Sequence, residues 1–336
     1  MLRTNSGTEG PITLASTSRT HTKRLRVNAV ADQRDHKVKR YRCSQRWQLT
    51  RLSLFVILAP MALGGCGPKV KMFHPVGPVS RIEEHLMYLS MILIAIVVIP
   101  TIALLWYMVR RFRDVPDNHA PYRPNNGGNA ALEVVWWGIP IVIVAILGTA
   151  TAKDAFVLTR PPTVAKPPLT IEVTSLNWKY LFQYPEQKIA TVNYCNIPTN
   201  RPIRFILTAN APMGSFWVPE LGGQEYTMPG MAMQLWLQAD KSGTFYGHNA
   251  NFTGVGYAHM KFFVKASPAA NFDQWAQQVK TNAPPLTQAG YDQLSAPGLM
   301  KSTSYSSYPQ GSFMKLVMRE GGMYSQHDKA IFDEIH

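Results

Sequence analysis

Two long stretches without a charged residue constrain the fold of this chain more than any other feature. Residues 86–109 and 134–152 contain no Lys, Arg, Asp or Glu over 24 and 19 positions. A helix of about 20 apolar residues crosses a hydrocarbon core of about 30 Å, so both stretches predict transmembrane helices. Pro100 and Pro140 lie inside them, where neighbouring helices can satisfy the freed carbonyls. A buried hairpin in a soluble protein is the alternative.

The basic charge of the chain is concentrated in its leader. The 336 residues carry a net charge of +14, and residues 1–65 hold twelve Lys or Arg against three Asp or Glu, which is +9. Residues 66–336 therefore carry only +5. A strongly basic domain would indicate nucleic-acid binding, but here the excess belongs to the leader, and we expect no nucleic-acid partner.

A lipoprotein signal is predicted to end at Cys66. An uncharged run, residues 52–65, follows three arginines and closes in Leu-Gly-Gly before this cysteine. A basic region, a short apolar region and small residues describe a secretory signal, and Leu-Gly-Gly-Cys resembles a bacterial lipobox. Fourteen residues are too few to span a bilayer as a helix. We expect residues 1–65 to be leader and signal peptide and Cys66 to be lipidated. Counted from Met1 the signal is unusually long, so either translation starts later or a basic extension precedes it.

The lipidated cysteine also sets the orientation of the hairpin. With Cys66 outside, the first helix runs inward, the second runs outward, and everything after Lys153 is periplasmic. Four arginines in the 110–133 loop, against three basic residues between 66 and 85, favour the same orientation slightly. An aromatic belt is then expected at the cytoplasmic interface, made of Trp106, Tyr107, Trp136 and Trp137. The lipidated N-terminus and the hairpin together form the first folded region, residues 66–155.

Residues 169–265 predict an all-β sandwich beyond a proline-rich linker. Short alternating segments separated by turn residues carry this prediction, for example 169–173, 203–207, 233–237 and 260–264. Residues 268–305 predict short amphipathic helices, the first with Asn271 as its N-cap. Residues 306–336 have no readable pattern. The three cysteines, Cys43, Cys66 and Cys195, have neither disulfide-framework nor zinc-ribbon spacing.

The stretch 246–260, with 214–219 upstream, resembles subunit II of the haem-copper oxidases. The family's scaffold residues are present as Ser215, Phe216, Trp217, Pro219, Pro229, Gly230, Tyr246, Gly247 and Gly254. The resemblance implies a cupredoxin-like Greek-key sandwich behind a two-helix membrane hairpin.

The copper ligands of the family are missing. In the cytochrome c oxidase branch this domain binds a dinuclear copper centre, and its two histidines fall here on Gly214 and Tyr257. The two bridging cysteines fall on Asn249 and Thr253, and the glutamate whose carbonyl coordinates copper falls on Asn251. Only the methionine is kept, as Met260. The one cysteine of the domain, Cys195, lies 54 residues before Asn249, so neither a dinuclear nor a mononuclear blue-copper site can form. We expect no metal and no other cofactor in this chain.

Several nearby residues have a functional and a structural interpretation. His248 and His259 could replace the lost ligands, but strand neighbours face opposite ways, so an inward Met260 puts His259 outward, and we expect both histidines to be exposed. Three methionines close to Pro229 are expected to fill the core. Trp178 matches the family tryptophan that receives electrons from cytochrome c. Without copper, we expect it to pack or to contact subunit I.

A subunit II without copper ligands resembles the quinol oxidase branch. The lipoprotein signal and the 268–305 segment resemble the bo-type ubiquinol oxidases of Gram-negative inner membranes. The resemblance implies a non-catalytic subunit of an oxidoreductase that oxidises ubiquinol, reduces oxygen to water and pumps protons. It implies subunit I as the main contact, subunits III and IV as further partners, membrane lipid, and no cytochrome c. Haems and one copper are then expected in subunit I. A non-enzymatic lipoprotein with a degenerate cupredoxin domain is the first alternative, and a cytochrome c oxidase subunit is the second.

Glu133 matches a family glutamate at the cytoplasmic start of the second helix, at the mouth of a proton pathway into subunit I. The plain alternative is that a carboxylate in the first turn of a helix favours the helix dipole, by about 0.3 to 1 kcal/mol. The resemblance favours the proton-pathway entrance.

Overall fold

The computed structural model describes residues 71–116, 118–121, 128–162 and 166–319, all of which belong to one compact unit of the chain. The predicted leader and signal peptide and the predicted lipidation site, Cys66, lie outside the described residues, as do residues 320–336.

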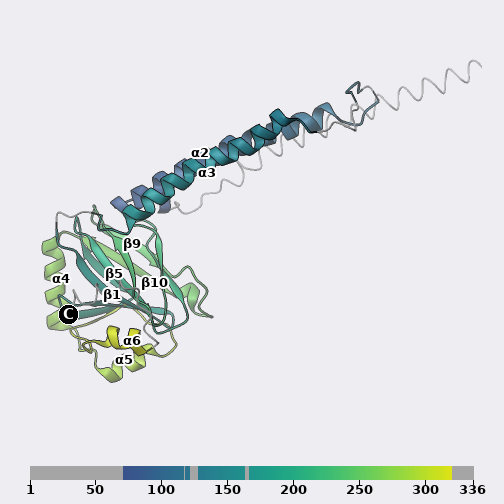
Figure 1. Cartoon of the computed structure of the whole chain (residues 1–336). Helices are drawn as coiled ribbons and strands as arrows, with labels where there is room; N and C mark the ends of the chain where they lie inside the picture. Colours follow the sequence, from purple (N-terminus) through teal and green to yellow (C-terminus); the bar gives the residue numbers. More distant parts are fainter. Residues whose placement is uncertain (1–70, 117, 122–127, 163–165, 320–336) are drawn as a thin grey trace, which may run out of the picture. The chain divides into compact units, whose positions relative to one another are not determined.

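Two long helices form the predicted hairpin (Figure 1). They are α2 (Pro78–Arg111) and α3 (Ala130–Leu158), and a single 3-10 turn, η1 (Lys71–Phe73), precedes them. Both are long and apolar enough to cross a membrane, and both extend beyond the uncharged stretches at each end. Pro78 starts α2 in the first turn, where a proline costs no hydrogen bond, and the Asn129 side chain caps α3 by accepting from the N–H groups of Ala131 and Leu132.

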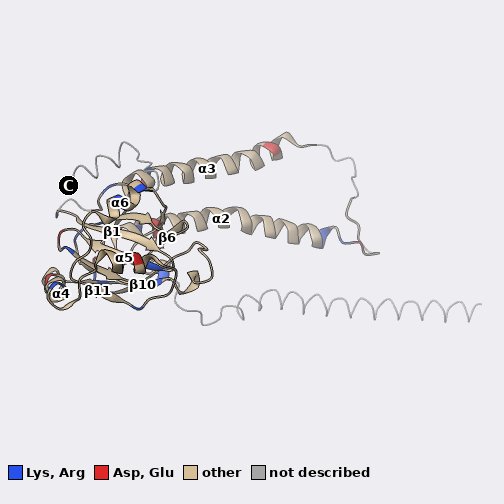
Figure 2. Cartoon of the chain, turned by 90° about the horizontal axis from the view of Figure 1, so that it is seen from below, with Lys and Arg blue, Asp and Glu red and all other residues tan. Residues whose placement is uncertain are grey.

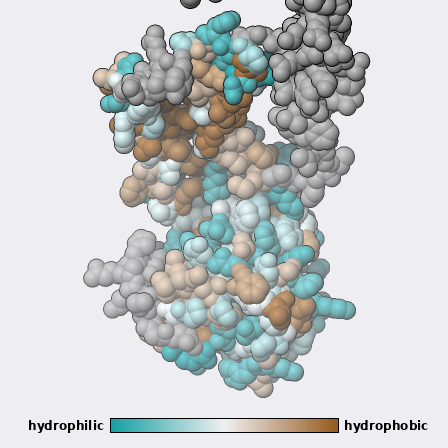
Figure 3. Space-filling view, turned by 90° about the vertical axis from the view of Figure 1, so that its right-hand side faces the viewer, coloured by the Kyte–Doolittle hydropathy of each residue, from teal (hydrophilic) through white to brown (hydrophobic). Residues whose placement is uncertain are grey.

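The apolar side chains of the hairpin are mostly exposed. Large residues such as Ile99, Val134 and Val144 are more than 60% accessible, and only Leu93 in the central part of α2 is buried. Figure 2 shows Lys, Arg, Asp and Glu sparse along both helices, and Figure 3 shows strongly hydrophobic residues gathered on them. Such a surface is stable only in lipid or against other membrane helices.

Two β-sheets pack face to face to form the sandwich. The six-stranded sheet has the order β11-β3-β2-β1-β5-β8, and the five-stranded sheet has the order β4-β10-β9-β6-β7. The strands are β1 (Leu169–Leu176), β2 (Lys179–Tyr184), β3 (Ile189–Val192), β4 (Tyr194–Pro198), β5 (Ile203–Ala209), β6 (Gly214–Trp217), β7 (Gln224–Thr227), β8 (Met233–Leu237), β9 (Gly243–His248), β10 (Lys261–Ser267) and β11 (Thr303–Tyr305). The pairs β1–β5 and β4–β10 are parallel and the others antiparallel, so the chain crosses between the sheets rather than meandering.

An aromatic cluster fills the space between the sheets. The rings of Phe216 and Phe262 stack with centroids 4.8 Å apart, and Tyr180 meets Phe262 edge-on at 4.9 Å. Gly247 is required beside them, because a Cβ at this position would lie 2.2 Å from the Phe262 ring. The scaffold residues of β6 and β9 are therefore held in place by the core itself.

Helices and one strand from the C-terminal segment cover the six-stranded sheet and the edge of the sandwich where β3 and β4 meet. They are α4 (Ala269–Asn282), α5 (Gln288–Ser295), β11 and α6 (Ser312–Arg319). The N-cap of α4 is Pro268, so the expectation that Asn271 caps this helix was wrong; Asn271 lies inside the first turn, and its N–H donates to the Pro268 carbonyl. The segment 268–305 also contains a strand besides its helices. The unread region after 305 contains α6, whose Phe313 and Val317 pack against Ile206.

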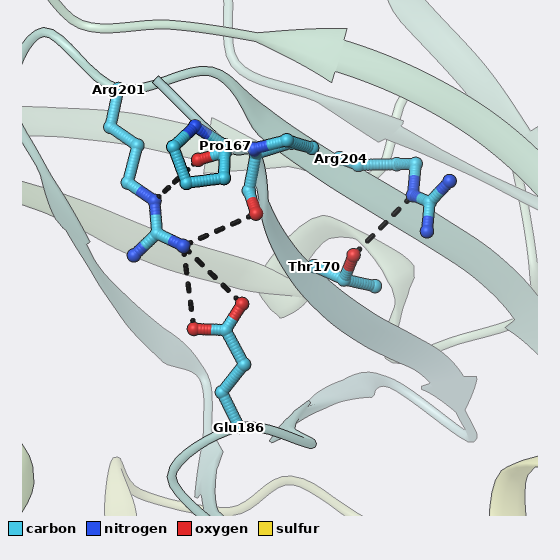
Figure 4. A network of polar contacts seen from close by, with 6 residues as sticks. Pro167, Thr170, Glu186, Arg201 and Arg204 are labelled. Carbon is cyan, nitrogen blue, oxygen red and sulfur yellow. Dashed lines mark hydrogen bonds and ion pairs between the residues drawn. The ribbon is translucent and has the colours of Figure 1, made fainter. Parts of the chain in front are cut away.

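Arg201 fixes the point where the linker enters the sandwich (Figure 4). Its Nε donates to the Pro167 carbonyl at 2.8 Å, and its second nitrogen reaches the Pro168 carbonyl and the Glu186 carboxylate. On the neighbouring strand positions, Arg204 donates to the Thr170 hydroxyl. The Arg201 bonds therefore join the residues just before β1 to the turn just before β5, and the Arg204 bond joins the two strands themselves.

Candidate functional site

The loop between β9 and β10, together with the start of β6, is the candidate site. Gly214 opens β6, Asn249 directly follows β9, and Met260 directly precedes β10. The fold brings these positions together: the Asn249 N–H donates to the Met260 carbonyl at 3.2 Å, and a Cβ on Gly214 would lie 3.5 Å from Asn249 Oδ1.

Asn249 is the centre of a buried hydrogen-bond network. Its Oδ1 accepts from the Ser215 N–H at 2.9 Å, from the Asn251 N–H at 3.0 Å and from the Ser215 hydroxyl at 3.4 Å. Its Nδ2 donates to Thr253 Oγ1 at 3.1 Å. Ser215 Oγ in turn accepts from the Ala250 N–H at 2.7 Å. The network holds the loop closed against β6, because each of these bonds joins the loop to itself or to that strand.

The two positions that the resemblance relates to bridging cysteines, Asn249 and Thr253, are thus hydrogen-bonded to each other. Asn251 contributes its backbone N–H to this network. Tyr257 does not join it: its partly exposed ring packs edge-on against Phe252, with centroids 5.1 Å apart, in the 3-10 turn η2 (Tyr257–His259). Met260 is buried, 2% exposed, and points into the core.

Gly214 has little room for a side chain. A Cβ there would lie 3.0 Å from Thr227 Oγ1, on the neighbouring strand β7. The Thr227 hydroxyl is buried and has no hydrogen-bond partner within the described residues. Any larger residue at position 214 must displace this hydroxyl.

Trp178 covers the outer side of the loop. Its Nε1 donates to the Thr253 carbonyl at 2.9 Å, and a Cβ on Gly256 would lie 2.3 Å from its ring. Its φ of 64° lies in the left-handed region, which bulky residues rarely adopt. The structure therefore bears out the packing part of the expectation for Trp178. No sequence pattern indicated its backbone conformation or the role of Ser215 as a partner of Asn249.

The two histidines of the loop behave differently. His259 is exposed as expected, although it ends η2 instead of lying on a strand. His248 is partly buried, so the expectation of an exposed side chain was wrong. Its ring lies between Trp217 and Tyr246, with centroids 5.1 and 5.2 Å away, and its Nδ1 is buried without a partner. Burial, with help from Lys261 and Lys71, lowers the pKa of His248.

The donor atoms of this region are amide, hydroxyl and thioether groups. Within the described residues, no group of three or more His, Cys, Asp or Glu side chains lies close enough to hold a metal ion. Cys195 is fully buried in β4, and the Tyr184 hydroxyl donates to its sulfur at 3.2 Å. Burial raises the pKa of this thiol to about 12, so it stays protonated and unreactive.

Glu133 lies in the first turn of α3, where the sequence places it. It is exposed, its N–H donates to the Asn129 carbonyl at 3.0 Å, and its carboxylate bends back toward Gly128, so that a Cβ on this glycine would be 2.7 Å from Oε1. The carboxylate is therefore accessible from the side of the 110–133 loop.

Comparison with known proteins places this architecture in a family. Residues 169–267 match the family model "Cytochrome C oxidase subunit II, periplasmic domain". The chain is 41% identical to a quinol oxidase subunit 2 of Bacillus cereus over 78% of this chain and 90% of that protein. It is 37% identical to a cytochrome bo(3) ubiquinol oxidase subunit 2 of Pseudomonas aeruginosa over 74% of this chain and 76% of that protein. The periplasmic domain of subunit II of cytochrome oxidase of Bradyrhizobium japonicum aligns with a TM-score of 0.33 and 24% identity, over 34% of this chain and 96% of that one. The chain therefore belongs to the haem-copper oxidase subunit II family, as a member of its quinol oxidase branch.

Proposed function

We propose that this chain is the structural subunit II of a terminal ubiquinol oxidase and that its extramembrane domain holds no copper centre. The assembled enzyme would oxidise ubiquinol, reduce oxygen to water and pump protons. The observation that carries the proposal is the Asn249 network, which occupies the positions where a copper-binding relative needs its thiolates.

Copper does not fit the residues at this site. Copper in cupredoxin-type sites is held by thiolate and imidazole ligands, and the positions Gly214, Asn249, Asn251, Thr253 and Tyr257 offer none. Asn249 Oδ1 already accepts three hydrogen bonds from the protein. A metal here would have to break these bonds and would gain only the Met260 thioether, which is a weak ligand by itself.

In this proposal the two-helix hairpin forms the main contact with subunit I. Its exposed apolar side chains would pack on subunit I, which would hold the haems and the one copper of the complex, with subunits III and IV alongside. The sandwich would cover the periplasmic side. The name of the Pseudomonas aeruginosa relative supports ubiquinol as the electron donor. The predicted lipobox supports a bacterial lipoprotein, which we propose lies in a Gram-negative inner membrane.

Oxygen uptake by the purified complex tests the proposal. Ubiquinol and reduced cytochrome c are offered separately, and the copper-to-haem ratio is measured on the same preparation. We expect turnover with ubiquinol alone and one copper for two haems. Turnover with cytochrome c, or a second and third copper atom per complex, would refute the proposal.

We further propose that Glu133 stands at the entrance of a proton pathway into subunit I. Its exposed position in the first turn of α3 supports this role. Glu133→Ala should slow ubiquinol-dependent oxygen uptake by the purified complex, whereas Asp154→Asn, near the other end of α3, should not. Unchanged oxygen uptake by Glu133→Ala, at normal haem content, would refute the proton-pathway role. The carboxylate would then only stabilise the start of α3 through the helix dipole.

Lipidation of Cys66 should be nearly redundant for membrane retention, because two spanning helices already anchor the chain. We expect Cys66→Ala to stay in the membrane if its precursor is exported. Release of this variant by an alkaline wash would show that the helices are not a sufficient anchor.

A further inference from the structure

Three arginines lie at the C-terminal end of α2. Arg110 and Arg111 belong to the last turn of the helix, and Arg113 lies just beyond it. All three are exposed, and Figure 2 shows basic residues at this end of the helix. One carboxylate, Asp114, lies in the same stretch, so residues 106–116 carry three positive charges and one negative charge, a net charge of +2.

These guanidinium groups have no acidic partner in the described part of the chain. No ion pair or side-chain hydrogen bond joins them to Asp114, or to Glu133 at the start of α3. The basic residue near the other end of α2 is different, because Arg81 donates to the Asp240 carboxylate at 2.6 Å. The three arginines therefore keep both their charge and their N–H groups available for an anion from outside the chain.

The chain orders this end of α2 without using the guanidinium N–H groups. Asn118 Nδ2 donates to the Arg113 carbonyl at 2.6 Å and to the Arg111 carbonyl at 3.3 Å. The Arg110 guanidinium lies over the Trp106 ring, 4.2 Å from its centroid. Stacking on an aromatic face holds the guanidinium in one plane and leaves its N–H fork free for a planar or tetrahedral oxyanion.

The helix dipole alone does not explain this group of arginines. Basic residues in a last turn favour the dipole, but the effect falls off within that turn, and Arg113 lies beyond it. The arginines also alternate with apolar side chains, since Phe112 and Val115 are 59% and 37% exposed. Exposed cations beside exposed apolar residues are typical of a segment that lies in the membrane interface.

The arginines lie at the depth of the lipid phosphates. The uncharged stretch of α2, residues 86–109, has 24 residues and ends directly before Arg110. At 1.5 Å per residue this stretch is about 36 Å long, slightly longer than a hydrocarbon core of about 30 Å. The exposed rings of Trp106 and Tyr107 one turn earlier are typical of the same interface. Headgroup phosphates are the most abundant anions at this depth.

We propose that Arg110, Arg111 and Arg113 bind the phosphate groups of anionic phospholipid of the phosphatidylglycerol class. Each guanidinium can donate two parallel N–H bonds to one phosphate, and Phe112 and Val115 lie among the acyl chains of the same lipids. Anionic lipid is favoured over zwitterionic lipid, because a choline or ethanolamine group brings a cation against a patch that is already positive. This proposal rests on the membrane hairpin and is independent of the electron donor of the enzyme.

Other anions match fewer of these features. A free phosphate ion pairs with the guanidinium groups but leaves Phe112 and Val115 exposed to water. An acidic loop of another subunit would have to bring carboxylates to the hydrocarbon boundary, where lipid phosphates already surround the helix end.

Paired photolabelling of the assembled complex tests the proposal. The purified complex is reconstituted into phosphatidylcholine vesicles that contain a trace of either phosphatidylglycerol or phosphatidylcholine, each with a diazirine at the same position next to the headgroup. Mass spectrometry measures the label in residues 106–116. We expect phosphatidylglycerol to label this segment roughly tenfold more strongly than phosphatidylcholine, and this preference to fall in about 1 M salt, which screens charges beyond about 3 Å.

Variants identify the groups that bind the lipid. Arg110→Gln and Arg113→Gln should each lower the labelling ratio about fivefold, the effect of removing one basic residue at an anionic membrane surface. The triple change of Arg110, Arg111 and Arg113 to Gln should bring the ratio near one. Arg160→Gln removes the same charge from an exposed arginine after α3 and should leave the ratio in residues 106–116 unchanged. The haem content of each variant complex checks that assembly is intact.

Four results would overturn the proposal. Two of them are equal labelling of the wild type by the two probes and an unchanged ratio in the triple variant. Loss of the preference in millimolar inorganic phosphate would assign the patch to a free anion instead of a lipid. A carbodiimide crosslink from Arg113→Lys to a carboxylate of another subunit would assign it to a protein contact.

Discussion

The loop after β9 and the edge strand β8 both hold buried polar side chains, but the two regions differ in how far these side chains are hydrogen-bonded. In the loop, Asn249 uses its carbonyl oxygen three times and its amide nitrogen once. On β8, Trp236 Nε1 and Gln234 Oε1 are buried with no hydrogen-bond partner among the described residues. The loop thus satisfies most of its buried polar atoms internally, whereas β8 leaves two of its own unsatisfied.

The hydrogen-bonded loop is what we expect at positions that hold no metal. When polar residues replace the ligands of a buried metal site, they must form hydrogen bonds with each other or with the backbone. An unpaired buried polar group costs about 1 to 3 kcal/mol. Asn249 and Thr253 meet that requirement with a bond of 3.1 Å. Among the described residues of this region, closure is incomplete at two atoms, the Thr227 hydroxyl under Gly214 and His248 Nδ1.

The largest expected change in unfolding free energy comes from breaking the hydrogen-bond network around Asn249. Asn249→Leu removes the acceptor of two backbone N–H groups, those of Ser215 and Asn251, and leaves both buried. We expect the extramembrane domain of the full chain to lose roughly 4 kcal/mol of unfolding free energy. Urea unfolding in detergent, followed by tryptophan fluorescence, measures this loss. Asn251→Ala is the control, since Asn251 joins the network through its backbone. A loss below that of the control would mean that the loop is not held by Asn249.

The next largest expected change is in the pH dependence of stability, and it comes from Glu172, a buried carboxylate beneath the C-terminal segment. Glu172, on β1, is 7% exposed, and burial raises its pKa from 4.5 to about 7. It is paired across the sheet with Gln183 and lies near Tyr308. Because the folded pKa is above the unfolded one, the folded state is favoured while the carboxyl is protonated, and stability falls as the pH rises from about 4.5 to about 7.

Glu172→Gln should remove this pH dependence. We expect wild type and variant to unfold at similar urea concentrations near pH 5, and the variant to be more stable by at most roughly 3 kcal/mol near pH 8. Glu186→Gln, at an exposed ion pair with Arg201, is the control and should show no such difference. Parallel pH profiles of wild type and Glu172→Gln would mean that this carboxylate has a charged or hydrogen-bonding partner.

The sequence predicted the parts of the fold that follow from periodicity. The uncharged stretches gave the hairpin, and the alternating segments gave β1, β5, β8 and β10. Prediction from the sequence failed for elements whose formation depends on tertiary contacts. The strand β11 has three residues and exists because it pairs with β3, and α6 is stabilised by burying Phe313 and Val317 on the sheet. Neither has a local signal strong enough to read.

The candidate site was predictable as a set of positions but not as a set of bonds. The resemblance predicted that Asn249, Thr253 and Met260 would meet. It could not predict that Asn249 bonds to Ser215, because the choice among nearby polar partners depends on distances of tenths of an ångström. For the same reason His248 was expected outside, although its ring is held between Trp217 and Tyr246.

The smallest expected effect gives the most direct test of the comparison. Gln234→Met keeps the length of the side chain and removes an oxygen that is buried without a donor. We expect the unfolding free energy to be unchanged or raised by about 1 kcal/mol, because replacing an unsatisfied polar group by an apolar one of similar shape removes its desolvation cost. Gln183→Met is the matched control in the same sheet. Gln183 Oε1 is also buried without a partner, but Gln183 Nε2 donates to the Ser312 hydroxyl at 2.9 Å. This change therefore loses a hydrogen bond as well, and it should be more destabilising than Gln234→Met by about 1 kcal/mol. Urea unfolding of both variants decides between the two kinds of buried amide. Equal losses would show that Gln234 is satisfied within the folded chain, and the contrast between the loop after β9 and strand β8 would then fail.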